Sequence, residues 1–284
     1  MNNGLAGDRG SAAGRALVTG ASTGIGRATV VALAARGWRV AATMRSPQDA
    51  GDLGTLSGVC VLKLDVTDPG SVRSAVAEAV ETFGGLDAVV NNAGFAVDGV
   101  FEAMDDEVLT RQFEVNVLGL MRVTREVIPI MRRQRQGTIV QVSSMGGRIT
   151  FPLYSVYHAT KWAVEGFSES LAYELQPHGI KLRLVEPGAV RTDFYGRSRE
   201  RITPPDDAGY AEFVTRCEEI SLSAGLEGAP PEAVAATVVR AITDRSTRLR
   251  YPVAAPAPLL VALRKVLPES VFLSLIRRRY RIQG

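Results

Sequence analysis

The stretch A-L-V-T-G-A-S-T-G-I-G, residues 16–26, leads from a short apolar run into a helical segment through a turn that contains three glycines. Glycines in such a turn permit a tight bend, let the backbone approach a pyrophosphate, and let the helix pack closely on the strand. Three residues separate Gly20 from Gly24, which differs from the G-x-G-x-x-G spacing. A glycine-rich turn can also serve only to pack a helix on a strand, without binding a ligand. Its position after the first strand favours a nucleotide-binding loop.

Beyond this turn the sequence alternates short apolar runs with longer helical stretches, which is typical of βαβ units and a parallel sheet. We expect strands at residues 16–19, 38–43, 59–64, 86–91, 138–143, 180–185 and 248–253. We expect helices at residues 25–36, 70–83, 105–134, 155–177 and 231–244. Pro252 suits an edge position for the last strand, because proline cannot donate to a sheet ladder. The predicted fold is α/β: a single-domain, doubly wound, Rossmann-like parallel sheet of about seven strands with helices on both faces.

Three segments flank or interrupt this predicted domain, which spans residues 15–256. Residues 1–14 are polar and glycine-rich, unlike a signal peptide or an anchor, so we expect a flexible tail. Residues 195–229, rich in Gly, Pro and charge, follow the sixth strand, where an excursion suits a substrate lid; a tolerated surface insertion is the alternative. Residues 257–284 form a basic, amphipathic extension of two short helices that meet at Pro268.

Composition excludes several classes of protein. The 284 residues carry a net charge of only +3, too small a field to indicate a nucleic-acid binder. Two cysteines and two histidines support neither a disulfide framework nor a zinc site, so we expect a reducing compartment and no metal. The sequence lacks an apolar run of about 18 residues, so no transmembrane helix is predicted and a cytoplasmic protein is expected.

The charge is distributed unevenly along the chain. Residues 257–284 contain six basic side chains and one acidic one, a net +5, so the remainder of the chain carries −2. A segment that is both basic and apolar is compatible with peripheral contact with an anionic membrane surface. The favoured alternative is that these helices cover the pocket or dock on the sheet edge, and an extended tail can also alter homo-oligomer assembly.

The segment Y-S-V-Y-H-A-T-K places Tyr157 and Lys161 four residues apart, so that on a helix both side chains share one face. A tyrosine needs help to act as an acid or base, because its ordinary pKa is about 10. A nearby ammonium favours the phenolate and lowers that pKa. An isolated Y-x-x-x-K is more often an ordinary pair of surface residues one helical turn apart. The motif therefore indicates catalysis only when other motifs of a catalytic site accompany it.

Six motifs together resemble those of the short-chain dehydrogenase/reductase family, and they occur in that family's order. They are T-G-A-S-T-G-I-G at 19–26, N-N-A-G at 91–94, Asn116 in F-E-V-N-V-L-G, Ser144 thirteen positions before Tyr157, Y-x-x-x-K at 157–161, and P-G-A-V-R-T at 187–192. The resemblance runs from about Arg15 to Thr192. The sequence around Tyr157 looks more like the hydroxysteroid- and retinol-dehydrogenase-like branch than the ketoacyl-carrier reductases.

The resemblance implies an enzyme that interconverts a carbonyl and an alcohol. Tyr157 would be the general acid or base, Lys161 would lower its pKa and hold the nicotinamide ribose, and Ser144 would hydrogen-bond the substrate oxygen. Asn116 would bind a water that links Lys161 to solvent; a helix-kinking or capping amide is the alternative. The implied cofactor contacts are Gly20, Ser22, Thr23, Gly24, Ile25, Gly26, Arg45, Asp65, Val66, Asn92, Ala93, Gly94, Tyr157, Lys161, Pro187, Gly188, Val190 and Thr192.

The end of the second strand indicates the cofactor. An Asp or Glu there selects NAD by binding the adenosine 2′-hydroxyl, whereas a basic residue accommodates a 2′-phosphate. Here Met44 occupies the position of that acid and Arg45 follows it, so NADP(H) is predicted. Asp65 resembles the family's adenine-binding Asp and does not bear on the phosphate.

The substrate is expected to be a lipophilic ketone or alcohol, resembling a steroid, a retinoid or an aromatic ketone. This expectation rests on apolar and aromatic residues next to the catalytic motifs, which are also often core. The pocket candidates are Phe95, Ser144, Met145, Phe151, Tyr154, Phe194 and Tyr195. Two rivals stay open, a catalytically silent NADP(H)-binding sensor and a membrane-recruited interaction protein on the same fold.

Overall fold

In the computed structural model, residues 14–192, 198–205 and 209–282 are described, and they form one α/β domain around a parallel sheet. The strands lie in the order β3-β2-β1-β4-β6-β7-β9, and every neighbouring pair is parallel. Their bounds are β1(Arg15–Thr19), β2(Arg39–Met44), β3(Val59–Lys63), β4(Ala88–Asn91), β6(Gly137–Val142), β7(Ile180–Pro187) and β9(Arg250–Val253). The predicted seven-stranded doubly wound sheet is confirmed, and β9 with Pro252 lies at an edge as expected.

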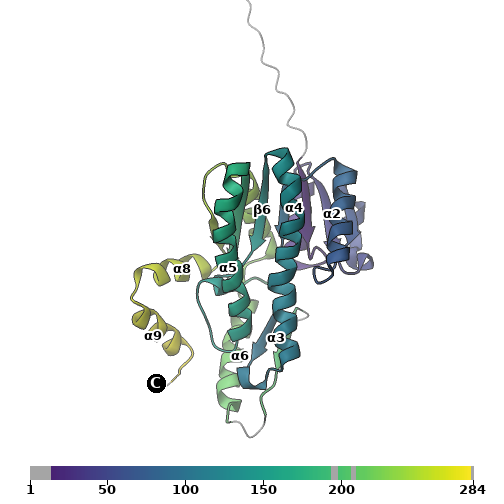
Figure 1. Ribbon diagram of the computed structural model, residues 1–284. Helices are drawn as coiled ribbons and strands as arrows, with labels where there is room; N and C mark the ends of the chain where they lie inside the picture. The colour runs from purple at the N-terminus through teal and green to yellow at the C-terminus, as the bar shows by residue number, and fades with distance from the viewer. Residues whose placement is uncertain (1–13, 193–197, 206–208, 283–284) are drawn as a thin grey trace, which may run out of the picture.

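Helices cover both faces of this sheet. On one face α1(Gly24–Ala34) and α7(Pro231–Thr243) bury Val30, Leu33, Val234 and Val238 against the strands. On the other face, seen in front in Figure 1, lie α2(Pro69–Phe83), α4(Leu120–Gln134) and α5(Ser155–Leu175). Short 3₁₀ helices complete the connections at η1(Pro47–Thr55), η2(Phe101–Ala103), η4(Met145–Gly147) and η5(Gln176–His178).

The helix predicted at residues 105–134 is interrupted. It consists of α3(Asp106–Phe113), a π-helical segment η3(Glu114–Gly119) and α4. The Asn116 side chain lies at the interruption and exchanges two hydrogen bonds with the backbone of Phe95, at 3.0 and 2.8 Å. We attribute the wider turn to these tertiary bonds, since π-helical segments occur mostly where local function or packing requires them.

A second sheet was not predicted. It pairs β5(Ala96–Gly99) with β8(Arg199–Ile202) in parallel and so joins the predicted lid region to the body of the domain. Arg199 and Asp98 form a buried, two-pronged ion pair across it, with both N···O distances at 2.5 Å. The described part of residues 195–229 also contains α6(Ala211–Leu226).

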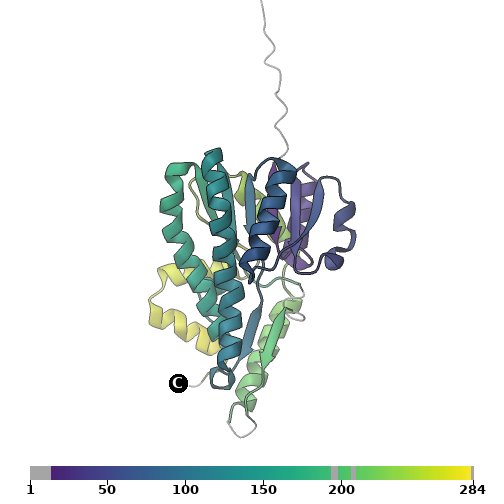
Figure 2. The ribbon, with the colours of Figure 1, turned by 45° about the vertical axis from the view of Figure 1, so that its right-hand side comes forward.

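The C-terminal extension contains two helices, α8(Ala257–Val266) and α9(Glu269–Arg279), which meet at Pro268 as expected. Figures 1 and 2 show α6, α8 and α9 at the same end of the sheet, away from the end where the chain enters from residue 14. Residues 1–13 of the predicted N-terminal tail lie outside the described residues.

Candidate active site

A cavity of about 1200 Å³ opens where the parallel strands end. Residues at the carboxyl ends of β1, β2, β3, β4, β6 and β7 line one side of it, because parallel strands bring those ends to one edge of the sheet. The other side is formed by β8, α6 and the two C-terminal helices. The cavity is therefore bounded by the sheet and by the two segments that lie beyond the motif-bearing region.

The glycine turn after β1 forms one end of the cavity. Gly20 has a φ of +64°, which favours glycine, and a Cβ atom on Gly26 would collide with the Gly20 carbonyl oxygen and with Asn92. Within the described residues Thr23 makes no side-chain cap bond, so backbone N–H groups at the start of α1 stay available to an anion. Gly26 packs behind the turn and does not line the cavity, whereas Gly20 and Gly24 do.

Hydrogen bonds from β4 hold this turn in place. The Thr19 hydroxyl accepts from the backbone N–H groups of Asn92 and Ala93, both at 3.0 Å. The Asn92 side-chain amide donates to the carbonyl oxygens of Thr19 and Gly20, again at 3.0 Å. Asn92 thus lines the cavity and fixes the glycine turn, and Thr19 is a positioning residue that the sequence analysis missed.

Ser144, Tyr157 and Lys161 all line the cavity. Ser144 caps the short helix η4 by accepting from the Gly146 N–H at 3.0 Å, and Tyr157 and Lys161 lie one turn apart on α5. The Lys161 ammonium donates to the Val142 carbonyl at 3.0 Å and lies 5.8 Å from the centre of the Tyr157 ring. Burial lowers the pKa of Lys161 to about 8, although the charge of Glu165 opposes this shift.

Asn116 lies behind the cavity and does not line it. Its amide donates to the Phe95 carbonyl and, at 3.2 Å, to the hydroxyl of Thr160, which in turn donates to the Tyr157 carbonyl at 2.7 Å. This chain of bonds fixes the first turn of α5 from the side of η3. The arrangement agrees with the helix-kinking alternative, and the water-binding role stays a prediction.

The remaining predicted cofactor residues are brought together along the cavity. Arg45 is exposed at its mouth, and one oxygen of Asp65 accepts from both the backbone and the hydroxyl of Thr67, at 2.9 and 2.7 Å. The further predicted residues that line the cavity are Ser22, Thr23, Ile25, Val66, Ala93, Gly94, Pro187, Gly188, Val190 and Thr192. Predicted pocket residues Phe194 and Tyr195 lie outside the described residues.

A sequence profile described as short chain dehydrogenase matches residues 15–203. The chain belongs to the short-chain dehydrogenase/reductase family. Helix α6 and the C-terminal helices lie beyond the matched region. The match confirms the family predicted from the motifs, and the chain is therefore an oxidoreductase, an enzyme that acts on CH–OH groups.

Several relatives resemble this short-chain dehydrogenase over most of their length. The uncharacterized oxidoreductase YusZ of Bacillus subtilis is 36% identical, over 93% of this chain and 97% of its own. A 3-ketodihydrosphingosine reductase of Bacteroides thetaiotaomicron is 32% identical, over 94% and 98%. An NADPH-dependent 3-dehydrocapnine reductase of Ornithobacterium rhinotracheale is 31% identical, over 89% and 93%.

Among solved structures, a short-chain dehydrogenase from Streptomyces avermitilis superposes with a TM-score of 0.83 at 34% identity, covering 93% of this chain and 95% of that one. The cavity residues of the present dehydrogenase fit a nicotinamide cofactor, because the turn that requires Gly20 leaves space for a pyrophosphate at the start of α1. The narrower hydroxysteroid- and retinol-dehydrogenase-like branch stays a prediction.

The substrate side of the dehydrogenase cavity includes the predicted residues Phe95, Met145, Phe151 and Tyr154. The Tyr154 hydroxyl is 2.7 Å from that of Ser221 on α6, which joins the two walls. Sequence reasoning did not identify the residues of the far wall, which are Ser198, Arg199, Glu200, Ile220, Ser221, Ala224, Pro256, Leu260, Phe272, Leu275, Ile276, Arg279 and Tyr280. The amphipathic spacing of the C-terminal extension indicated that its helices have an apolar face. It did not indicate that this face lines the cavity.

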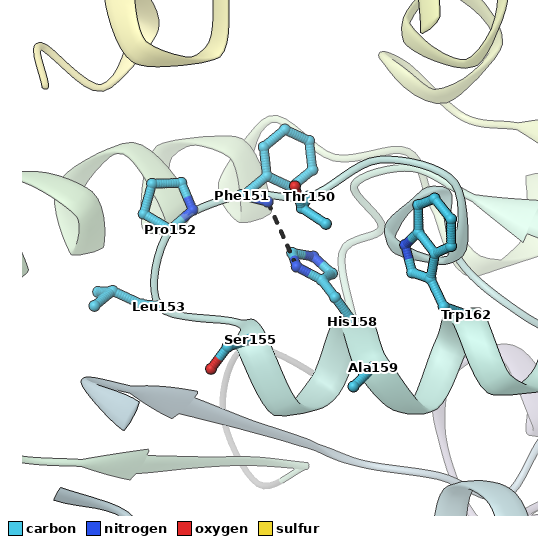
Figure 3. A pocket seen from close by; sticks show the side chains of 8 residues that line it. All are labelled: Thr150, Phe151, Pro152, Leu153, Ser155, His158, Ala159 and Trp162. Atoms are coloured by element: carbon cyan, nitrogen blue, oxygen red, sulfur yellow. Dashed lines mark hydrogen bonds between the residues drawn. The ribbon is translucent and has the colours of Figure 1, made fainter. Parts of the chain in front are cut away.

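A smaller hollow of about 430 Å³ shares Phe151 and His158 with this cavity, and Figure 3 shows the side chains around it. The Phe151 N–H donates to His158 Nδ1 at 3.5 Å, and burial lowers the pKa of His158 to about 4. His158 is therefore neutral near pH 7. It packs against Tyr157, at 5.9 Å between ring centres, and acts as part of the wall.

Proposed function

We propose that this enzyme is an NADP(H)-dependent oxidoreductase that interconverts a carbonyl and an alcohol on a lipophilic substrate. The observation that carries the proposal is a single cavity in which Ser144, Tyr157 and Lys161 lie on the sheet side and apolar side chains of α8 and α9 lie on the other. A polar reactive end and an apolar remainder suit a lipophilic carbonyl compound.

Each catalytic side chain has a defined task in this proposal. Ser144 donates a hydrogen bond to the substrate oxygen and stabilises the negative charge that develops on it. Tyr157 gives its hydroxyl proton to that oxygen in reduction and removes a proton from the alcohol in oxidation. Lys161 stabilises the resulting phenolate, because its ammonium lies close to the Tyr157 ring. When bound, the nicotinamide supplies or accepts the hydride at the carbon.

The preference for NADP(H) rests on the end of β2. Met44 is buried there and offers no carboxylate for a 2′-hydroxyl, while Arg45 is exposed at the mouth of the same cavity. A guanidinium can bind a phosphate through two parallel hydrogen bonds, which makes Arg45 suited to a 2′-phosphate. The NADPH dependence of the 3-dehydrocapnine reductase relative supports the same preference.

We expect the purified full chain to oxidise NADPH with at least one member of a panel of steroid, retinoid, aromatic and long-chain carbonyls. NADPH should be preferred to NADH about tenfold or more in kcat/KM, the value of one charge-assisted phosphate contact. Nicotinamide absorbance measures both quantities.

Arg45→Glu should lose the preference for NADPH, whereas Arg36→Glu, the same charge change on an exposed residue after α1, should keep it. A wild-type preference for NADH would contradict the cofactor assignment, and no turnover across the panel would contradict the reaction.

The lipophilic substrate is supported by the C-terminal helices. Phe272 is 2% exposed and lines the cavity together with Leu260, Ile276 and Tyr280. The ring of Tyr280 lies 6.3 Å from that of Phe151, so α9 meets the substrate side of the site. This supports the interpretation that the extension covers the pocket.

Replacing Phe272 with Ala is expected to raise KM for a lipophilic carbonyl about tenfold or more, because a substrate that loses about 60 Å² of apolar contact with the ring loses about 1.5 kcal/mol of binding free energy. The affinity for NADPH should stay unchanged, since the glycine turn and Arg45 lie elsewhere on the cavity. Leu259→Ala is the matched control, because Leu259 lies on the same pair of helices but is 63% exposed. Equal effects of the two changes on KM would show that α9 does not touch the substrate.

The alternative of a silent sensor is not favoured, because the family and its named relatives are oxidoreductases. No helix in the described part of the chain is long and apolar enough to cross a membrane. Contact of the exposed basic surface of the C-terminal helices with an anionic membrane, and assembly into a homo-oligomer, stay predictions.

A further inference from the structure

Five charged side chains gather next to the strand end that leads into Pro187. Arg250 on β9 lies 2.9 Å from Glu165, 3.4 Å from Glu186 and 2.5 Å from Glu169. Arg148, which follows η4, lies 3.7 Å from Glu186. This group, called the carboxyl cluster below, brings three carboxyl groups to two guanidinium groups.

The most buried carboxyl groups of the carboxyl cluster are incompletely satisfied by its two guanidinium groups. The Glu186 side chain has no exposed surface, the Glu165 side chain is 5% exposed and that of Glu169 is 50% exposed. Among the described residues, both oxygens of Glu186 and one of Glu165 lack a hydrogen-bond partner. Because a buried carboxylate without hydrogen bonds is costly even beside a guanidinium group, Glu186 favours keeping its proton next to Glu165.

The charges that surround Glu186 support this view. Burial and then the negative charge of Glu165 raise the pKa of Glu186 to about 7, while Arg148, Arg250 and, from α8, Lys265 act in the opposite direction. Glu186 therefore keeps its proton to a higher pH than an ordinary carboxyl group does. The third negative charge that loss of this proton creates would repel Glu165 across the contact between β7 and α5.

That contact connects the three segments that carry the proposed catalytic groups. Glu186 directly precedes Pro187 and Gly188, Glu165 lies one helical turn beyond Lys161 on α5, and Arg148 directly follows the η4 turn capped by Ser144. A Cβ atom on Gly147 would lie 2.8 Å from Glu165 Cγ, so η4 packs directly on the cluster. A change in the charge of the cluster therefore acts on all three segments at once.

We propose that Glu186 is a positioning residue of this active site, and that a proton held by the pair Glu165–Glu186 keeps the Pro187 strand end, α5 and the Ser144 turn packed together. On deprotonation the proton leaves to solvent and the packing loosens. The role in catalysis rests on the proposed function, but the packing and its effect on the cofactor side of the cavity do not require turnover.

The test compares the full chain with Glu186→Gln, which keeps the shape of the side chain and cannot ionise. A carboxyl whose pKa is raised in the folded state binds its proton more tightly there than in the unfolded chain, so stability falls as pH rises from about 4.5 through 7. We therefore expect the wild-type Tm to fall between pH 5.5 and 8.5 by about 3 °C or more beyond the fall seen in Glu186→Gln. The NADPH Kd should rise more over the same range in the wild type than in Glu186→Gln, because the titration of Lys161 is common to both.

Two further variants make the test decisive. Glu169→Gln alters a carboxyl that contacts the same Arg250 but is half exposed, and it should keep the wild-type pH dependence. Glu165→Gln removes the neighbouring charge, so the transition should move to lower pH, and this variant decides the matter if Glu186→Gln does not fold. A purely structural role for Glu186 would lower Tm equally at every pH.

Parallel pH profiles in the wild type and Glu186→Gln would overturn the proposal. An unchanged transition in Glu165→Gln would do the same. If the chain shows the expected Tm and Kd profiles but reduces no carbonyl in the panel, the proposed function fails while the carboxyl-cluster proposal stands.

Discussion

Turnover by the Tyr157→Phe variant is expected to fall about 10³-fold or more, while its affinity for NADPH stays that of the wild type. The lost hydroxyl is the group that we propose transfers the proton, and the Lys161 ammonium, which donates to the Val142 carbonyl on β6, stays in place. The ring should stay in place, since it is 8% exposed and packs against Tyr154 and His158 at 6.2 and 5.9 Å. Steady-state kcat and a fluorescence titration with NADPH provide the two measurements.

Two tyrosines on or next to the same helix provide controls for Tyr157→Phe. Tyr173→Phe removes a hydroxyl from a side chain on α5 that is 72% exposed, and kcat should not change. Tyr154→Phe removes the hydrogen bond to Ser221 and should act on KM through the pocket wall rather than on kcat. Residual turnover above about one tenth of the wild type in Tyr157→Phe would exclude the assigned role, because general acid–base catalysis contributes more than that.

The sheet could be predicted because its signals are local. A central strand buried on both faces, such as β4, reads as a near-continuous apolar run, and the glycine turn fixes where the first βα unit begins. The parallel order of the strands also allowed most residues of the site to be predicted. Motifs far apart in sequence follow successive strands, so Arg45, Asn92, Ser144 and Pro187 all reach one cavity.

What could not be predicted depends on tertiary contacts. Strands β5 and β8 carry no alternating apolar pattern, because the Asp98–Arg199 ion pair provides part of their buried contact. The helix-kinking alternative for Asn116 was the signal of the break within residues 105–134, but the break itself comes from the hydrogen bonds between Asn116 and the distant Phe95. Amphipathic spacing predicted α9 but not the direction of its apolar face.

The charge distribution in the sequence likewise concealed the carboxyl cluster. Glu165, Glu186 and Arg250 come from three different elements and Arg148 from the segment after η4, and each is ordinary in its local sequence. Their meeting requires β7 and β9 to pair with Glu186 opposite Pro252. A count of charges along the chain therefore cannot show which of them share a buried site.

Lys161→Met tests the electrostatic part of the mechanism, and it should lower alcohol oxidation at pH 7 about 10²-fold. Methionine keeps an aliphatic stem but removes the cation 5.8 Å from the Tyr157 ring. Without that charge the phenolate of Tyr157 loses a stabilising cation, so less of it is available as the base.

The diagnostic result is the pH profile of Lys161→Met in the direction of alcohol oxidation. Its activity should recover as pH rises toward 10, because hydroxide then removes the proton that the ammonium no longer helps to release, whereas Tyr157→Phe has no group to ionise and should show no recovery. Lys181→Met is the matched control: Lys181 also donates to a backbone carbonyl at 3.0 Å, but at the amino end of β7. If Lys161→Met kept the wild-type profile, or stayed inactive at every pH, Lys161 would act through binding alone and the phenolate of Tyr157 would need another source of stabilisation.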